Sequence, residues 1–250
     1  MSSPVPFALD EARWAQARDQ LVQGGRVHIG GALDERFALA LRDAVAAAPW
    51  SLALNTGAQG REFLPEHIAR LDPGRATRLG QVVQSGAERG FQYLSDSYRI
   101  STLYDEGHVR EGLLADLYEA FNSPAMLARW RDLTGDAAIC YADMQATRYR
   151  PGHFLTTHDD DLPEKGRRYA YVLNLTQGWN PDWGGLLLFH GPGGHIAEGY
   201  APAWNALNVF RVKQPHAVSL VAPFAAVDRL SITGWLRTIP DPRSPFGGDS

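Results

Sequence analysis

Several features are scarce in this chain, and each scarcity argues against a class of protein. The 250 residues include one cysteine, Cys140, so no internal disulfide can form. Its place in the apolar run Ala137–Tyr141 predicts a buried, unreactive thiol. No run of 18 apolar residues occurs, and residues 1–10 lack the basic and then apolar stretches of a secretory leader. We therefore expect a protein of the reducing cytoplasm, without a membrane span.

Clusters of basic residues and internal repeats are absent as well. The formal charge is -4 and no Lys/Arg run is present, which disfavours direct binding of nucleic acid. With 44% hydrophobic residues, a chain of this length can bury a full core as one unit. We expect residues 1–250 to form a single unit, with 1–138 as mainly helical support, 139–237 as a β core and 238–250 as a tail. The sequence does not indicate the oligomeric state.

Hydrophobic periodicity changes along the chain from helical to strand-like. In the first part it predicts helices over 10–23, 34–49, 110–121 and 124–133, two helical pieces over 61–89 broken at Asp72-Pro73-Gly74, and extended segments at 26–29, 50–55 and 90–102. From Ile139 onward it predicts short strands at 139–149, 169–175, 185–189, 206–212, 217–221 and 230–236, separated by turns rich in Gly, Pro and Asp. This spacing is typical of a β-barrel or double sheet.

The stretch from Tyr149 to Asp161 contains the pattern His158-x-Asp160. An imidazole nitrogen and a carboxylate oxygen two residues apart can point to one metal ion at the end of a strand. A site with two histidines and one carboxylate holds Fe(II) on one face and leaves the opposite positions open. Chance alone gives roughly 0.6 such pairs in a chain of this composition, so a second histidine is needed to support the interpretation.

Among the other histidines, His216 is the best candidate for that third ligand. His153 lies too close in sequence, and His190 and His195 flank a Gly-Pro-Gly-Gly turn, where exposed polar residues are common. His216 opens the predicted strand 216–221.

A later strand carries a candidate for binding an anion. Alternation places Arg229 and Ser231 on one face of the stretch 228–235, with Trp235 on the same face. A guanidinium beside a hydroxyl suits the end of a dicarboxylate, because arginine offers a planar fork of donors. Without the metal site, the alternative is an ordinary salt bridge at the mouth of a barrel.

The motifs together resemble the prolyl-hydroxylase branch of the 2-oxoglutarate/Fe(II) oxygenases, and within it most closely the ribosomal-protein prolyl hydroxylases. The resemblance covers about residues 139–237. It is carried, in order, by Tyr149, His158-x-Asp160, Tyr171-Val172-Leu173-Asn174, Trp183-Gly184-Gly185, Trp204-Asn205, His216 and the strand from Arg229 to Trp235.

The resemblance implies an α+β protein with a double-stranded β-helix (jelly-roll) core and an N-terminal helical layer. It implies a metal site for Fe(II) made by His158, Asp160 and His216, which would be the catalytic residues. It further implies that 2-oxoglutarate binds through Arg229, with contributions from Tyr171, Tyr149 and Ser231. Molecular oxygen would be the second cosubstrate, with ascorbate as a supporting reductant.

The function that follows is a dioxygenase that hydroxylates a C–H bond, with a prolyl residue of a protein or peptide, ribosomal in the first instance, as the substrate. Three alternatives stay open. The substrate could be a free amino acid or another small molecule. The protein could instead be a cupin-like metal enzyme that does not use 2-oxoglutarate and gives Arg229 no role. It could also be a non-catalytic sensor, against which the intact triad argues. The position and stereochemistry of hydroxylation and the biological role do not follow from the sequence.

Overall fold

Four of the seven α-helices in the described residues begin at a side chain that caps them. The computed structural model describes residues 6–56 and 60–246. The side chains of Asp10, Asp34, Asp72 and Ser123 each accept a hydrogen bond from a backbone N–H of the first turn, which satisfies a donor that the helix leaves free. The α-helices are α1 (Glu11–Gly24), α2 (Glu35–Ala46), α3 (Pro65–Ala69), α4 (Pro73–Ala87), α5 (Ile100–Asp105), α6 (Leu113–Phe121) and α7 (Pro124–Thr134); short 3-10 turns are η1 (Pro163–Lys165), η2 (Pro181–Trp183) and η3 (Pro192–Gly194).

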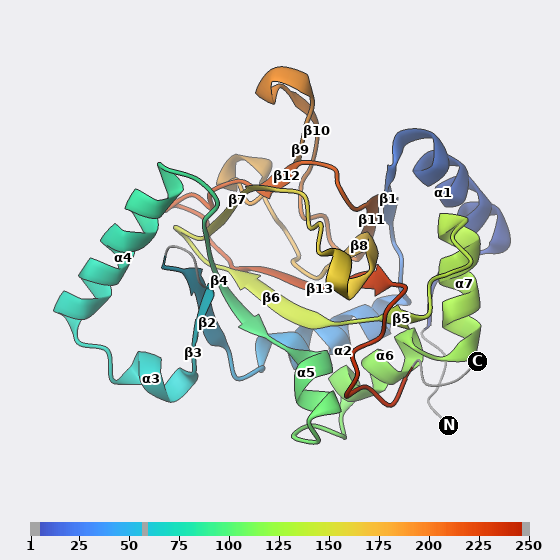
Figure 1. Ribbon diagram of the computed structural model, residues 1–250, viewed down its shortest axis with the longest axis horizontal. Coiled ribbons are helices and arrows are strands. Elements are labelled where there is room, and N and C mark those ends of the chain that lie inside the picture. Colours follow the sequence, from blue (N-terminus) through green and yellow to red (C-terminus); the bar gives the residue numbers. More distant parts are fainter. Residues whose placement is uncertain (1–5, 57–59, 247–250) are drawn as a thin grey trace.

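The strands of the described residues join into one antiparallel network. They are β1 (Arg26–Gly30), β2 (Ser51–Asn55), β3 (Gly60–Phe63), β4 (Tyr93–Tyr98), β5 (Tyr141–Ala142), β6 (Gln145–Tyr149), β7 (Phe154–His158), β8 (Arg167–Asn174), β9 (Leu187–His190), β10 (Ile196–Tyr200), β11 (Ala206–Arg211), β12 (His216–Val218) and β13 (Arg229–Arg237). Their order is β1-β11-β8-β13-β6-β4-β7-β12-β9-β10, with β2 and β3 beside β4 and β5 beside β13. The sheet curls on itself, because Ala170 and Val172 of β8 pack against Leu187 and Phe189 of β9 (Figure 1).

Most of the elements expected from the sequence are present, with several differences. Residues 100–102 were expected to be extended but begin α5, because Ile100 and Tyr104 are buried one turn apart on the same helical face. Residues 61–63 belong to β3 and not to a helix. The expected strand 139–149 is divided into β5 and β6 at Asp143-Met144. β7 and β10 were not expected as strands.

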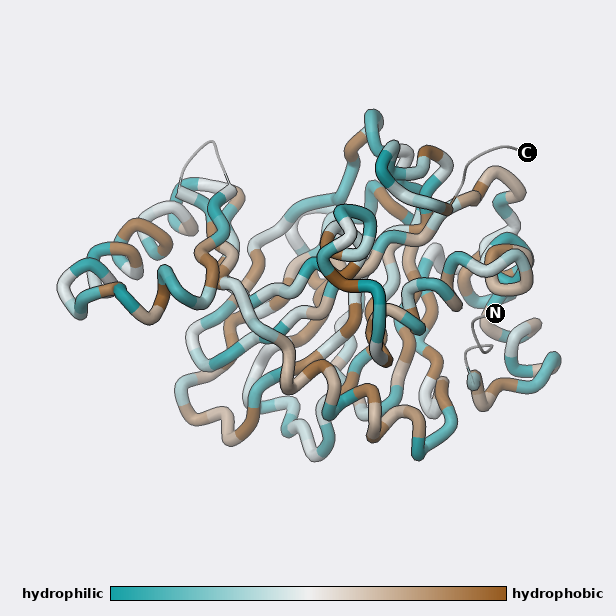
Figure 2. The backbone as a smooth tube through the Cα atoms, turned by 90° about the horizontal axis from the view of Figure 1, so that it is seen from below, coloured by the Kyte–Doolittle hydropathy of each residue, from teal (hydrophilic) through white to brown (hydrophobic). Residues whose placement is uncertain are grey.

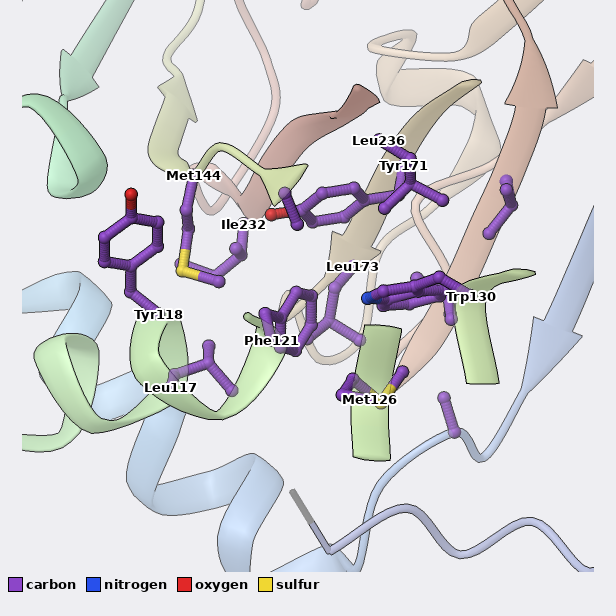
Figure 3. Packing of buried hydrophobic residues seen from close by; sticks show 14 of the residues in the cluster. Leu117, Tyr118, Phe121, Met126, Trp130, Met144, Tyr171, Leu173, Ile232 and Leu236 are labelled. Carbon is purple, nitrogen blue, oxygen red and sulfur yellow. The ribbon is translucent and has the colours of Figure 1, made fainter. Parts of the chain in front are cut away.

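The main sheet separates a helical core from the interior of the barrel. On the outer face, Tyr171 and Leu173 of β8 and Ile232 of β13 pack against Phe121 of α6 and Trp130 of α7 (Figure 3). Because neighbouring strand residues point to opposite faces, Ala170, Val172 and Asn174 of β8 point into the barrel. The helices therefore support one wall of a cavity that the sheet encloses.

A second helical pair, α3 and α4, packs on β2 and β4 at the other end of the molecule from α1 and α7 (Figure 1). The same separation is visible at right angles to that view in Figure 2. The arrangement is α+β, a double-stranded β-helix core with N-terminal helices, which confirms the expected fold class. In the described part of the chain, none of the helices has the length and apolar character that crossing a membrane requires.

Candidate active site

Two neighbouring strands bring the predicted triad together. β7 ends at His158, β12 begins at His216, and these two residues are directly opposite each other in the antiparallel register. Asp160 follows His158 with φ of 62°, a left-handed conformation that turns its carboxylate back toward the strand ends. The Nε2 atom of His158 lies 3.3 Å from Oδ1 of Asp160, and Nε2 of His216 lies 3.3 Å from Oδ2. The three side chains form a group that could hold one metal ion, with ligand atoms within 4.8 Å of one another.

Backbone carbonyls fix the orientation of both imidazoles. Nδ1 of His158 lies 3.0 Å from the carbonyl oxygen of Thr156, and Nδ1 of His216 lies 2.8 Å from that of Gln214. A carbonyl can only accept a hydrogen bond, so each Nδ1 carries a proton and each Nε2 faces Asp160, where its lone pair can bind a metal ion. Two lone pairs and a carboxylate that face one point need a cation between them. The donor set and its orientation therefore fit a divalent metal such as Fe(II).

The charge state of Asp160 agrees with this arrangement. Burial raises the pKa of its carboxyl group, but the contacts with the His158 and His216 imidazoles outweigh burial and lower the pKa well below its usual range. Asp160 is therefore an anion at neutral pH, as a metal ligand must be.

An inner cavity of about 100 Å³ extends from the triad into the barrel and is bordered by Arg229, Ser231 and Thr233 of β13. Arg229 lies opposite Tyr149 of β6, and Ser231 lies opposite Thr147, so β6 forms the adjoining wall. The hydroxyl groups of Ser231 and Thr147 are hydrogen-bonded to each other at 2.8 Å. As the alternation predicts, Arg229 and Ser231 share the inward face.

Arg229 is the unusual group in this cavity. The residue is only 2% exposed, and its guanidinium stands 5.2 Å from the centre of the Tyr149 ring. Its Nε and Nη1 atoms have no hydrogen-bond partner among the described residues, and burial lowers the pKa of the guanidinium. A buried cation without an anion is costly, so the site fits a ligand that brings a carboxylate. A dicarboxylate such as 2-oxoglutarate has that group.

Tyr171 does not match its expected role. It borders the inner cavity, but its ring packs against Phe121 and Trp130 on the helical side of β8 (Figure 3). Its hydroxyl donates a hydrogen bond of 2.7 Å to the carbonyl of Asp143. The expectation that Tyr171 donates to the cosubstrate is therefore corrected, because this residue is one position out of phase with the inward-facing residues of β8. Tyr149, by contrast, is on the inward wall.

An outer cleft of about 450 Å³ begins at His158 and Asp160 and leads away from the barrel. One side of it is aromatic, with Phe91 at 5.6 Å from the His158 ring and Tyr93 beside it. Lys165 and Arg167 also line this cleft. Sequence reasoning missed these two cations. The only available signal was the short basic stretch 165–168 before a predicted strand.

Comparisons with known proteins agree with this geometry. Residues 144–237 match the family model described as 2OG-Fe(II) oxygenase superfamily. Segments of the chain resemble prolyl 3-hydroxylase OGFOD1 of Mus musculus, 37% identical over 100 residues, and of Xenopus laevis, 34% identical over 114 residues. These matches cover 37% and 43% of the chain, but only 18% and 22% of the relatives' own length.

Solved structures share the fold over most of the chain. A prolyl-4-hydroxylase of Pseudomonas putida superposes with a TM-score of 0.58 and 21% identity, over 90% of this chain and 98% of that one. A prolyl hydroxylase of Trichoplax adhaerens, solved with a peptide fragment of hypoxia inducible factor, gives a TM-score of 0.57 and 15% identity, over 91% of each chain. Residues 144–237 thus match the 2OG-Fe(II) oxygenase superfamily and contain the His-Asp-His group that could hold a metal ion, while the solved structures show that the fold is shared with prolyl hydroxylases.

Proposed function

We propose that the protein is a dioxygenase that uses Fe(II), 2-oxoglutarate and oxygen to hydroxylate a prolyl residue of a protein. His158, Asp160 and His216 would hold the metal, and Arg229 would bind the far carboxylate of 2-oxoglutarate. With these groups bound, oxidative decarboxylation of 2-oxoglutarate to succinate and carbon dioxide supplies the oxidising power for inserting one oxygen atom into a C–H bond. The observation that carries the proposal is the unpartnered Arg229 guanidinium in a cavity that begins at the triad.

The chain's own residues have definable tasks in this scheme. Thr156 and Gln214 hold the two imidazoles through their carbonyls, so the ligands are oriented before the metal binds. Tyr149 and Ser231 lie beside Arg229 on the cavity wall, where they would restrict the bound dicarboxylate to one orientation. Arg229 also argues against the cupin-like alternative, which leaves this buried charge without a purpose.

The nature of the substrate rests on similarity and on the size of the outer cleft. The names of the curated relatives and of two solved structures describe prolyl hydroxylases, and one of those structures holds a peptide. A cleft of about 450 Å³ is within the usual range of ligand sites and is larger than a free amino acid requires. A ribosomal protein is the leading candidate, because the sequence motifs most resemble that branch. A free amino acid is the second candidate.

A lysate experiment tests the proposal. Proteins from cells that lack this protein are incubated with it, Fe(II) and 2-oxoglutarate, and mass spectrometry searches for prolyl residues that gain one oxygen atom. We expect such a gain with the native protein and none with Asp160→Ala or His216→Ala, because two ligands hold the metal weakly. Full activity of either variant would overturn the metal assignment, and turnover of free proline without any modified protein would favour the second candidate.

A further inference from the structure

The cationic side of the outer cleft has a charge pattern that the triad does not explain. Arg99 stands before α5, Lys165 ends η1 and Arg167 begins β8, and all three border the cleft. The whole chain has a formal charge of -4, so this grouping does not reflect an overall excess of basic residues. The fold has brought cations from three separate elements to the lining of one cleft.

These cations differ in how far they are neutralised. Nε of Arg99 lies 2.8 Å from a carboxylate oxygen of Glu62, which forms an ion pair. Arg167 has 11% of its side chain exposed, and its Cζ lies over Trp235 at 3.4 Å from the ring centre, which restrains the guanidinium. The Nε atom of Arg167 has no partner among the described residues. No described carboxylate comes within the 4.0 Å of a salt bridge to the ammonium of Lys165.

The acidic residues of the cleft are already engaged. Asp143 is held by Nη1 of Arg237 at 3.3 Å and by the backbone N–H of Trp235 at 2.7 Å. Asp160 lies 3.8 Å from Nη1 of Arg167, but its carboxylate belongs to the metal group. When the metal is bound, Lys165 and Arg167 remain without a full counter-charge at the entrance to the site. Burial and the like charge of Arg167 lower the pKa of Lys165, although the carboxylates of Asp143 and Glu164 act in the opposite direction.

The positions of the two cations relative to the metal group define where a carboxylate would bind. Arg167 is close to a metal-ligand oxygen, so a group that it binds lies beside the reacting carbon. Lys165 is exposed at the rim, two residues earlier in the turn. The aromatic wall formed by Phe91 and Tyr93 faces the same entrance and suits a prolyl ring.

We propose, resting on the proposed prolyl hydroxylase function, that the cleft selects a peptide segment with an acidic residue directly beside the target proline, and that Lys165 is the residue that recognises it. The aromatic wall takes the proline, Arg167 binds a carbonyl or carboxylate oxygen next to it, and Lys165 pairs with the neighbouring acidic side chain. A charge-assisted contact of this kind adds both affinity and correct register.

Pairs of synthetic peptides test this inference. Each peptide has blocked termini, glycine residues around one proline, and either Glu or its neutral isostere Gln immediately before or after that proline. We expect kcat/KM to be at least about fivefold higher for Glu than for Gln in one of the two positions, with a preference that weakens at high salt. Free L-proline is tested as a separate substrate, because its own carboxylate could bind the same cations as the acidic side chain of a peptide.

Variants of the chain's two lysines, Lys165 and Lys213, provide the matched comparison. Lys165→Gln should abolish the preference for Glu while it keeps turnover of the Gln peptide, and Lys165→Glu should favour a peptide with Lys at that position. Lys213→Gln should retain the native preference, because Lys213 pairs with Asp161 outside the cleft.

The outcomes separate the inference from the function on which it rests. Equal turnover of the Glu and Gln peptides contradicts the acidic preference but leaves the oxygenase in place. A preference that survives in Lys165→Gln contradicts the role of Lys165. Modification of lysate proteins without turnover of any peptide, or turnover of free proline alone, also contradicts the inference. Absence of succinate formation under every condition contradicts the proposed function itself.

Discussion

Replacing Arg229 by methionine should weaken binding of 2-oxoglutarate and, at the same time, stabilise the ligand-free protein. A hydrogen bond to a charged group contributes roughly 1.5 to 3 kcal/mol, so Arg229→Met should raise the dissociation constant of 2-oxoglutarate by about 10 to 150-fold. Arg229→Lys should be intermediate, because lysine keeps the charge and loses the planar fork. Binding of the metal should barely change, since Arg229 is not among the three side chains of the metal group.

The effect on stability has the opposite sign because the guanidinium is 2% exposed and two of its nitrogens have no partner. An unsatisfied buried polar group costs about 1 to 3 kcal/mol, and methionine of similar length removes that cost. We therefore expect the free energy of unfolding of the ligand-free protein to increase by an amount in this range.

Arg237 provides a matched control for both measurements. It is also buried, but its Nη1 lies 3.3 Å from Asp143 and its Nε donates to the carbonyl of Lys165 at 2.8 Å. Arg237→Met should lower the free energy of unfolding, because Asp143 loses its partner, and should leave affinity for 2-oxoglutarate unchanged. Anaerobic calorimetric titration of the Fe(II)-loaded proteins and urea unfolding of the ligand-free proteins measure the two effects. Unchanged affinity in Arg229→Met would place the carboxylate anchor elsewhere and reopen the cupin-like alternative.

Two further predictions concern residues outside the metal group. Tyr171→Phe should leave the affinity for 2-oxoglutarate within about twofold and lower the free energy of unfolding by about 1 kcal/mol, because one buried hydrogen bond to the Asp143 carbonyl is lost; a large loss of affinity measured by titration would contradict the corrected placement. Burial lowers the pKa of His153 from 6.5 to about 4, so the folded protein resists its protonation and stability should fall as the pH drops from about 6.5 to about 4, by about 3 kcal/mol. Urea unfolding at a series of pH values should show a smaller decline for His153→Asn, and an equal decline would refute this cause.

The site shows which parts of a functional centre a sequence can predict. The pattern His158-x-Asp160 and the alternation of Arg229 with Ser231 depend on neighbours along one strand, and the structure places them as predicted. The contact of His158 with His216 depends on the register between β7 and β12. The sequence pointed to His216 only through its position at the start of a predicted strand and through the family resemblance.

Local patterns could not predict which way Tyr171 points or that Arg99, Lys165 and Arg167 line one cleft. From Tyr169 to Asn174, β8 is buried on both faces, so its apolar residues do not show which side faces the cavity. β10 was missed for the opposite reason, since it lies largely exposed and lacks an apolar alternation. Lys165, Arg167 and Arg99 line the same cleft only because of the fold, since 66 positions separate Arg99 from Lys165 (165 − 99).

Anaerobic addition of Fe(II) and then 2-oxoglutarate, followed by visible absorption, tests the central claim most directly. A chelate of Fe(II) with a 2-oxo acid absorbs visible light, whereas Fe(II) with protein ligands alone does not. We predict one Fe(II) bound per chain and a visible band that appears with 2-oxoglutarate in the native protein and is absent in Asp160→Ala and His216→Ala. A band of native strength in either variant, or no band in the native protein, would contradict the assignment of this site.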